Sequence, residues 1–145
     1  MKVFLDTNVL LDWLLDRQNT FADEATMIAE AAEKGIVEAY ISAGSMYTIA
    51  YVLEKSGRKG AELRDSLNYI LLIFEIIPTS NTPFQKACLR NMKDLEDAFQ
   101  YEVALSFQLD YFVTANLKDF TSQDTTLLPV INPLKMLAII QASFS

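Results

Sequence analysis

Short apolar segments alternate with longer segments of helical periodicity along this chain. Val3 to Leu5 is an apolar run that favours a strand buried on both faces of a parallel sheet. Similar short runs predict further strands at residues 37–41, 74–77, 111–114 and 127–131, the last at the sheet edge. Apolar residues three and four positions apart predict helices near residues 9–14, 22–34, 43–55, 62–73, 84–91, 94–108 and 133–140. This alternation indicates an α/β fold, a three-layer α/β/α sandwich with a central, mostly parallel sheet.

The chain has the length of one domain, and we expect a single domain over residues 1–145. Asp6 follows one lysine and three apolar residues, so we expect no signal peptide. No apolar run approaches the roughly 18 residues of a membrane helix, and we expect no membrane partner. Cys88 is the one cysteine, which excludes an intrachain disulfide and favours a cytoplasmic protein.

The residue counts narrow the possible chemistry. The sequence contains no histidine, which excludes Ser-His-Asp and Cys-His catalysis and zinc sites built on histidine. A formal net charge of -7 argues against broad electrostatic binding to nucleic acid. Oxygen ligands remain, and a metal that bridges carboxylates to a phosphate could still bind nucleic acid locally.

Acidic stretches follow two of the predicted strands and begin one helix. Asp6 ends the first strand, Asn116 and Asp119 follow the strand at 111–114, and Asp97 begins a helix. Strand ends of a parallel sheet share one edge, so the first two stretches are expected to converge there, whereas spacing alone does not place Asp97. Carboxylates within about 4 Å would repel by roughly 4 kcal/mol per pair at an effective dielectric near 20. A cation would relieve that repulsion, and oxygen ligands favour Mg²⁺ or Mn²⁺.

Each acid also has an ordinary explanation. Asp6 can cap the first helix, and Asp94 and Asp97 can cap or favour the start of another. Asp119 can belong to a turn. Their occurrence at analogous ends of elements favours a shared site.

Three stretches resemble the PIN domain family, and its VapC-like toxins of bacterial toxin-antitoxin pairs in particular. They are Val-Phe-Leu-Asp-Thr-Asn-Val-Leu-Leu-Asp from Val3, Asp-Leu-Glu-Asp-Ala-Phe-Gln from Asp94, and Tyr-Phe-Val-Thr-Ala-Asn-Leu-Lys-Asp-Phe from Tyr111. Leu-Pro-Val-Ile-Asn-Pro-Leu from Leu128 is similar to the last strand and helix start of that family. The resemblance spans nearly the whole chain.

The resemblance implies a metal-dependent ribonuclease that hydrolyses RNA with one or two Mg²⁺ or Mn²⁺ ions. Asp6 and Asp97 would be the main metal ligands, and Asp119 would complete the site directly or through water. Asn116 lies where relatives have Asp or Asn. The supporting residues would be Asn8, Thr48, Asp94 and Thr114. An antitoxin protein is the implied partner, and the resemblance together with apolar helix faces favours a homodimer.

One position departs from the family pattern. Thr48 lies in the helix after the second strand, where the family usually has a glutamate. A hydroxyl can hydrogen-bond a metal-bound water but offers no charged ligand. Glu54 lies six positions later on another face of the helix. The departure bears on metal affinity and catalytic rate more than on the fold.

Other functions fit the sequence less well. A PIN fold whose chemistry has decayed would bind RNA or a protein without cutting, and this is the main alternative. A phosphorelay receiver would need an adjacent acid pair at Leu5-Asp6 and a lysine after the last strand, and both are missing. A phosphatase of the haloacid dehalogenase type would need an aspartate where Asn8 stands.

Overall fold

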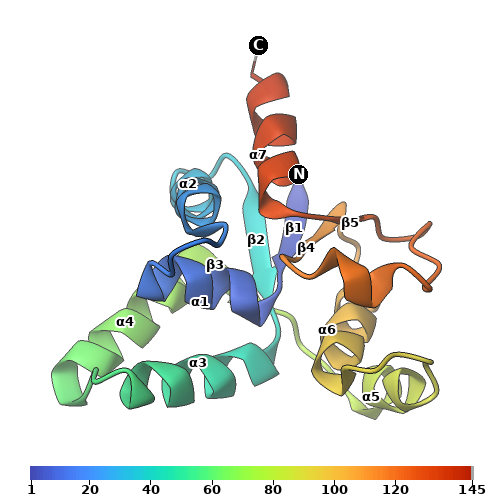
Figure 1. Cartoon of the computed structure of the whole chain (residues 1–145), viewed down its shortest axis with the longest axis horizontal. Coiled ribbons are helices and arrows are strands. Elements are labelled where there is room, and N and C mark those ends of the chain that lie inside the picture. Colours follow the sequence, from blue (N-terminus) through green and yellow to red (C-terminus); the bar gives the residue numbers. More distant parts are fainter. Residues whose placement is uncertain (145) are drawn as a thin grey trace.

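The computed structural model describes residues 1–144, and all its strands lie in one parallel sheet (Figure 1). The strands are β1 (Lys2–Leu5), β2 (Glu38–Ile41), β3 (Phe74–Ile76), β4 (Tyr111–Val113) and β5 (Val130–Ile131). Their order across the sheet is β3-β2-β1-β4-β5. The connecting helices are α1 (Thr7–Leu15), α2 (Ala22–Glu33), α3 (Ala43–Lys55), α4 (Gly60–Ile73), α5 (Asn81–Cys88), α6 (Leu95–Leu105), the 3-10 helix η1 (Leu117–Phe120) and α7 (Pro133–Ala142). The predicted α/β sheet fold is confirmed, with every pairing parallel.

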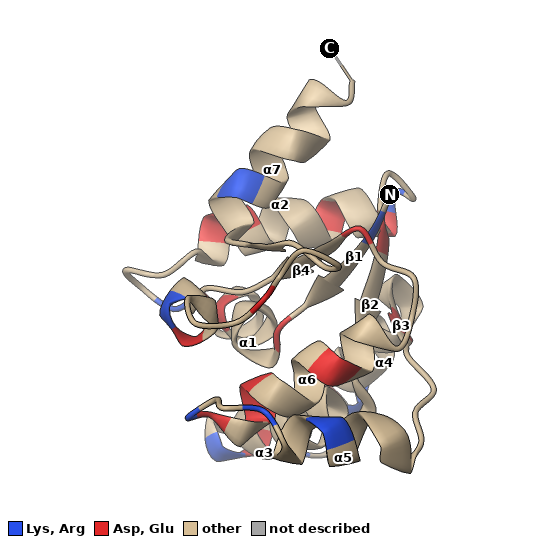
Figure 2. Ribbon diagram, turned by 90° about the vertical axis from the view of Figure 1, so that its right-hand side faces the viewer, with Lys and Arg blue, Asp and Glu red and all other residues tan. Residues whose placement is uncertain are grey.

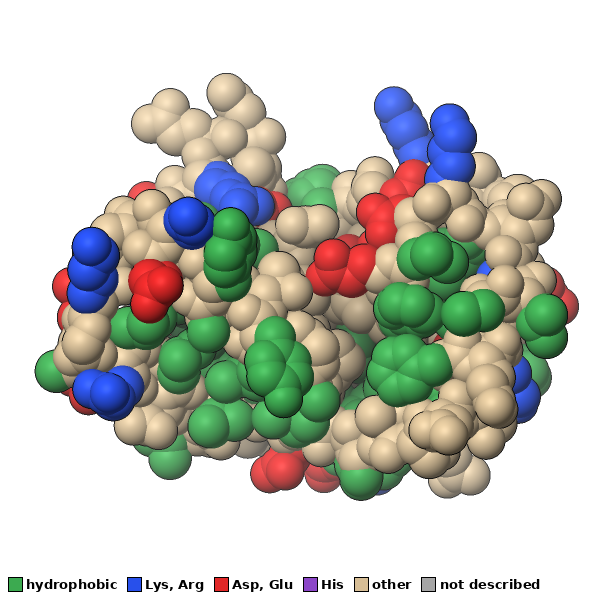
Figure 3. Space-filling model, turned by 90° about the horizontal axis from the view of Figure 1, so that it is seen from below, with side chains coloured by type: hydrophobic (Ala, Val, Ile, Leu, Met, Phe, Trp, Pro, Cys, Tyr) green, Lys and Arg blue, Asp and Glu red, His purple; other side chains and the backbone are tan. Residues whose placement is uncertain are grey.

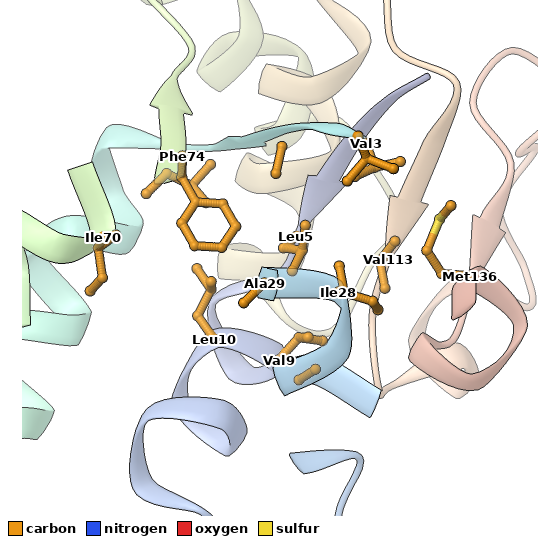
Figure 4. Packing of buried hydrophobic residues seen from close by; sticks show 14 of the residues in the cluster. Val3, Leu5, Val9, Leu10, Ile28, Ala29, Ile70, Phe74, Val113 and Met136 are labelled. Carbon is orange, nitrogen blue, oxygen red and sulfur yellow. The ribbon is translucent and has the colours of Figure 1, made fainter. Parts of the chain in front are cut away.

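Both faces of the sheet are covered, which makes three layers. Val3 and Leu5 of β1 point into a core shared with α1, α2, α3, α4 and α7 (Figure 4). Phe4 points the opposite way, into a second core with α5, α6 and η1. Successive residues of a strand face opposite sides, so a continuous apolar run satisfies both layers.

Side-chain caps begin several helices. The Ser42 hydroxyl accepts a hydrogen bond from the Ser45 N–H at the start of α3. Asn132 accepts one from the Lys135 N–H at the start of α7. These bonds satisfy N–H groups that have no partner within the helix.

Three predicted elements have a limit that is wrong by three residues, and the other predicted limits differ from the structure by at most two. The last strand begins at Val130 rather than residue 127, because Pro129 has no N–H to continue the ladder and Leu127 is exposed. The helix predicted at 84–91 begins at Asn81 and ends at Cys88, after which the Asn91 carbonyl accepts a hydrogen bond from Gln123. The helix predicted through 108 ends at Leu105.

No helix within residues 1–144 has the length and apolar character needed to cross a membrane.

The packing of Phe112 in the second core leads us to expect a large loss of stability when its ring is removed. Phe112 is fully buried and stacks on Phe4, with ring centroids 5.1 Å apart, and it meets Tyr101 and Phe120 edge-on or tilted. Phe112→Ala is expected to lower the free energy of unfolding, measured by urea denaturation, by about 3–5 kcal/mol. Leu127→Ala, at an exposed position, is the control and should change it by less than about 0.5 kcal/mol. Equal effects of the two variants would contradict this packing.

Candidate metal centre

The register of β1 and β4 places Asp6 beside Thr114. Leu5 pairs with Val113, and the Asp6 N–H continues the ladder by donating to the Val113 carbonyl at 2.9 Å. The Thr114 hydroxyl donates to Asp6 Oδ2 at 2.7 Å. Asp6 also caps α1, because its Oδ1 accepts from the Asn8 N–H at 3.3 Å. The predicted capping role of Asp6 is therefore confirmed.

A buried polar network fixes the other side of Asp6. The Gln100 amide Nε2 donates to Asp6 Oδ1 at 3.0 Å, and Gln100 Oε1 accepts from the Thr7 N–H at 3.0 Å. The Thr7 hydroxyl also donates to Gln100 Oε1 and lies 2.8 Å from the Ser45 hydroxyl. This network joins the end of β1 to α3 and α6, and it leaves the Asp6 carboxylate with three hydrogen-bond donors.

Three carboxylates meet at the start of α6. One carboxylate oxygen from each of Asp94, Asp97 and Asp119 lies within 4.8 Å of the other two. Asp94 caps α6 by accepting from the Asp97 N–H at 3.1 Å. Asp119 comes from η1, where the Asn116 side-chain amide donates to its Oδ2. Segments more than 20 residues apart in the sequence therefore share one acidic centre.

Asp97 is the unusual member of this centre. Its side chain is buried, and its Oδ2 has no hydrogen-bond partner among residues 1–144. Burial, the close Asp119 carboxyl and the charges of Asp6 and Asp94 raise the pKa of Asp97 to about 8. Burial also raises the pKa of Asp6, although the hydrogen bonds from Thr114 and Gln100 lower it. The charged form of Asp97 lacks a compensating partner, which a bound cation would provide.

The residues present fit a hard divalent cation. Carboxylate oxygens of Asp94 and Asp119 lie within 4.8 Å of a carboxylate oxygen of Asp97, and neither histidine nor an adjacent cysteine offers a softer ligand. Such an oxygen-only set suits Mg²⁺ or Mn²⁺.

The structure brings most of the residues predicted from the sequence to one edge of the sheet. Asp97 and Asp119 lie together, and Asp94, predicted to support them, is a full member of the cluster. Asp6 lies close enough for its charge to affect Asp97, yet hydrogen bonds occupy both its oxygens. Thr114 bonds Asp6 as described, and its hydroxyl accepts from the Asn116 N–H at 3.1 Å.

Two predicted supporting residues stand apart from the cluster. Asn8 is exposed and contributes its backbone N–H, rather than its side chain, to Asp6. Thr48 lies on α3, where it lines a pocket with Gln100 and Glu96.

The sequence argument missed Gln100 and Glu96. Gln100 lies three positions after Asp97 on the same side of α6, and its side chain is buried. The sequence signal that could have found it is a polar residue at that spacing among the inward-facing alanines of the helix. Much of the Glu96 residue is exposed, but its carboxyl is partly shielded from solvent, and this partial burial and the charges of Asp6 and Asp94 raise its pKa. No sequence pattern singled it out, because Glu in a first helical turn is ordinary.

The figures locate this centre on the molecule. Acidic segments at the end of β1 and the start of α6 face the same region beside the sheet (Figure 2). Seen from below, acidic side chains gather in a hollow with hydrophobic side chains on both sides of it (Figure 3). Asp94 is exposed and Asp119 is partly exposed, so a ligand can reach the centre from solvent although Asp97 is buried.

The raised pKa of Asp97 predicts a pH-dependent stability in metal-free protein. A carboxyl whose pKa rises from 3.8 to about 8 on folding binds a proton as the chain folds. The contribution of Asp97 to the free energy of unfolding is fully present below pH 3.8 and is lost as the pH rises through about 8. With a chelator present, the free energy of unfolding should fall between about pH 5 and about pH 8 by at most roughly 1 kcal/mol per pH unit.

Urea denaturation across this range measures the effect. Asp97→Asn should flatten the profile, since an amide does not titrate, and Mn²⁺ should restore stability to the wild type at the alkaline end. The same slope in wild type and Asp97→Asn would contradict the assignment.

Comparisons with known proteins agree with this fold. Residues 2–118 match the sequence family described as PIN domain. The chain is 32% identical over 134 residues to Ribonuclease VapC1 of Aquifex aeolicus (strain VF5), covering 88% of this chain and 89% of that protein. A chain in the crystal structure of VapBC2 from Rickettsia felis, bound to a DNA fragment from their promoter, has a similar fold, with a TM-score of 0.62 and 22% identity over 91% of this chain and 98% of that one. The chain therefore belongs to the PIN domain family.

Proposed function

We propose that this protein is a metal-dependent endoribonuclease that hydrolyses phosphodiester bonds of RNA, and the toxin of a toxin-antitoxin pair. The observation that carries the proposal is the buried Asp97 carboxylate, which keeps an unpartnered Oδ2 and clusters with the carboxylates of Asp94 and Asp119. In a folded protein, such a buried carboxylate stays charged only beside a cation; without one, it takes up a proton and becomes neutral. The 32% identity to Ribonuclease VapC1 supports RNA as the substrate.

The partners follow from the relatives. Likeness to VapC proteins supports an antitoxin protein as the binding partner, together with a cytoplasmic location. Large apolar side chains on α3 and α4, including Tyr47 at 80% exposure and Leu72 at 84%, are available for a protein contact. They support the further proposal of a homodimer.

The proposed roles follow from the contacts of each carboxylate. Asp97 and Asp119 are the proposed metal ligands, and Asp94 adds a third carboxylate at the start of α6. Asn116 orients Asp119 through its side-chain amide. Asp6, held by Thr114 and Gln100, lies near Asp97 and completes the proposed ligand set.

When bound, Mg²⁺ or Mn²⁺ supplies a Lewis acid and a water activated for attack on phosphorus. The acidic centre without a cation would repel a phosphate of RNA, so a bound cation would be needed for the scissile phosphate to approach these carboxylates, while the rest of the RNA could still bind elsewhere on the protein. The buried hydrogen-bond network of Thr7, Gln100 and Ser45 holds the Asp6 carboxylate in one orientation.

A PIN domain without catalytic activity is the second candidate. Thr48 favours it, because the helix after β2 offers a hydroxyl where the family usually has a carboxylate. Such a protein would bind RNA or a protein partner and would keep its cellular effect without the acids.

Substitution of Asp97 separates the two candidates. Asp97→Asn removes the charge that holds the metal but preserves the shape of the side chain. It should lower the rate of RNA cleavage in Mn²⁺, measured on a pool of labelled RNA fragments, by at least about 100-fold while RNA binding persists. Loss of growth arrest in cells that produce the variant should accompany the loss of cleavage.

Asp65→Asn is the matched control. Asp65 is exposed on α4 and takes the same change of charge, so its variant should cleave as the wild type does. The second candidate, a PIN domain without catalytic activity, would be favoured if Asp97→Asn arrested growth as strongly as the wild type. It would also be favoured if the wild type cleaved no RNA with either Mg²⁺ or Mn²⁺.

A further inference from the structure

A pocket opens beside the acidic centre, between the start of α3, the residues before α5, and α6. Its volume is about 150 Å³. Phe84 and Phe99 form an aromatic side, with ring centroids 5.3 Å apart and an interplanar angle of 63°. The polar side includes the hydroxyls of Ser45 and Thr48, and the side chains of Glu96 and Gln100.

The pocket adjoins the proposed metal centre, because residues that line it also contact or neighbour the acidic residues. Gln100 lines the pocket and donates to Asp6. Ser45 also lines it and belongs to the same network through Thr7. Glu96 precedes Asp97 directly in the first turn of α6. A molecule whose phosphate lies at the carboxylates would therefore place the group attached next to that phosphate at this pocket.

The chemistry of the lining favours a planar, uncharged group. No lysine or arginine lines the pocket, so it does not attract a phosphate. Its volume is well below the roughly 300–1,000 Å³ of sites for drug-sized ligands, which limits the occupant to about one ring system. An aromatic side with polar groups opposite is how proteins bind an unstacked base of single-stranded RNA.

Glu96 restricts which base would bind. An ionised carboxylate only accepts hydrogen bonds, through two oxygens side by side. Guanine presents two adjacent donors, N1–H and the N2 amine, on its Watson-Crick edge. Adenine and cytosine present one amine beside an acceptor, and uracil presents one N–H between two acceptors. A carboxylate therefore pairs fully only with guanine.

We propose that this pocket binds the base next to the scissile phosphate and that Glu96 makes guanine the preferred base. The proposal rests on the proposed ribonuclease function for the identity of the substrate. The first test does not depend on cleavage, so the proposal for the pocket and the proposed ribonuclease function can fail separately.

The first test is binding of the four nucleosides to metal-free protein. Nucleosides carry no phosphate, so the acidic centre does not repel them. Guanosine should shift the amide NMR signals of Ser45, Thr48 and Gln100 and should bind at least about ten-fold more tightly than uridine, adenosine or cytidine. Glu96→Gln replaces one acceptor with a donor at nearly constant shape and should abolish the preference.

Glu54→Gln is the matched control, because Glu54 is exposed on α3 and the charge change is the same. This variant should keep the preference for guanosine. Equal binding of all four nucleosides, shifts elsewhere than the pocket, or a guanosine preference that survives Glu96→Gln would overturn the proposal.

The second test maps the cut sites in a random RNA pool. Guanine should be enriched next to the cut for wild type and Glu54→Gln, and not for Glu96→Gln. Cuts without any base preference would contradict the proposed role of the pocket and leave the ribonuclease function intact. Guanosine binding in the pocket without any RNA cleavage would support the pocket and contradict the ribonuclease function.

Discussion

The pairing of β1 with β4 determines where every proposed ligand lies. Phe4 stacks on Phe112 across this pair, and one residue further Leu5 lies beside Val113. The next position on each strand is polar, so Asp6 and Thr114 meet at the sheet edge. A shift of one residue in the register of β1 would turn Phe4 into the other core and separate Asp6 from Thr114. The packing of the apolar residues of β1 therefore fixes the position of the polar site.

Helix α6 brings the second part of the centre. Its buried face, with Ala98, Tyr101 and Ala104, packs in the core that contains Phe4 and Phe112. That packing carries Asp97 to the strand ends and leaves its Oδ2 buried without a partner. The energy for bringing like charges together comes from this hydrophobic burial, and the unpaired carboxylate is the feature that a cation would complete.

Local sequence signals predicted the strands and the positions of Asp6, Asn116 and Asp119, because strand ends of a parallel sheet share one edge. They did not predict that Asp94 joins Asp97 and Asp119, since its capping geometry depends on where α6 lies against the sheet. Gln100 was missed for the same reason: its partners Asp6 and Thr7 are more than 90 residues away in sequence. The limits of β5 depended on the missing N–H of Pro129 and the exposure of Leu127, which apolar periodicity does not reveal.

The central claim is that these carboxylates together form a metal site. Calorimetric titration of the wild-type protein with Mn²⁺ tests it most directly, with Asp97→Asn as the variant and Asp65→Asn as the control. The account predicts saturable binding with proton release by the wild type and the control, because Asp97 must lose its proton to bind the ion, and no binding by Asp97→Asn. Absence of binding by the wild type, or equal binding by Asp97→Asn, would contradict it.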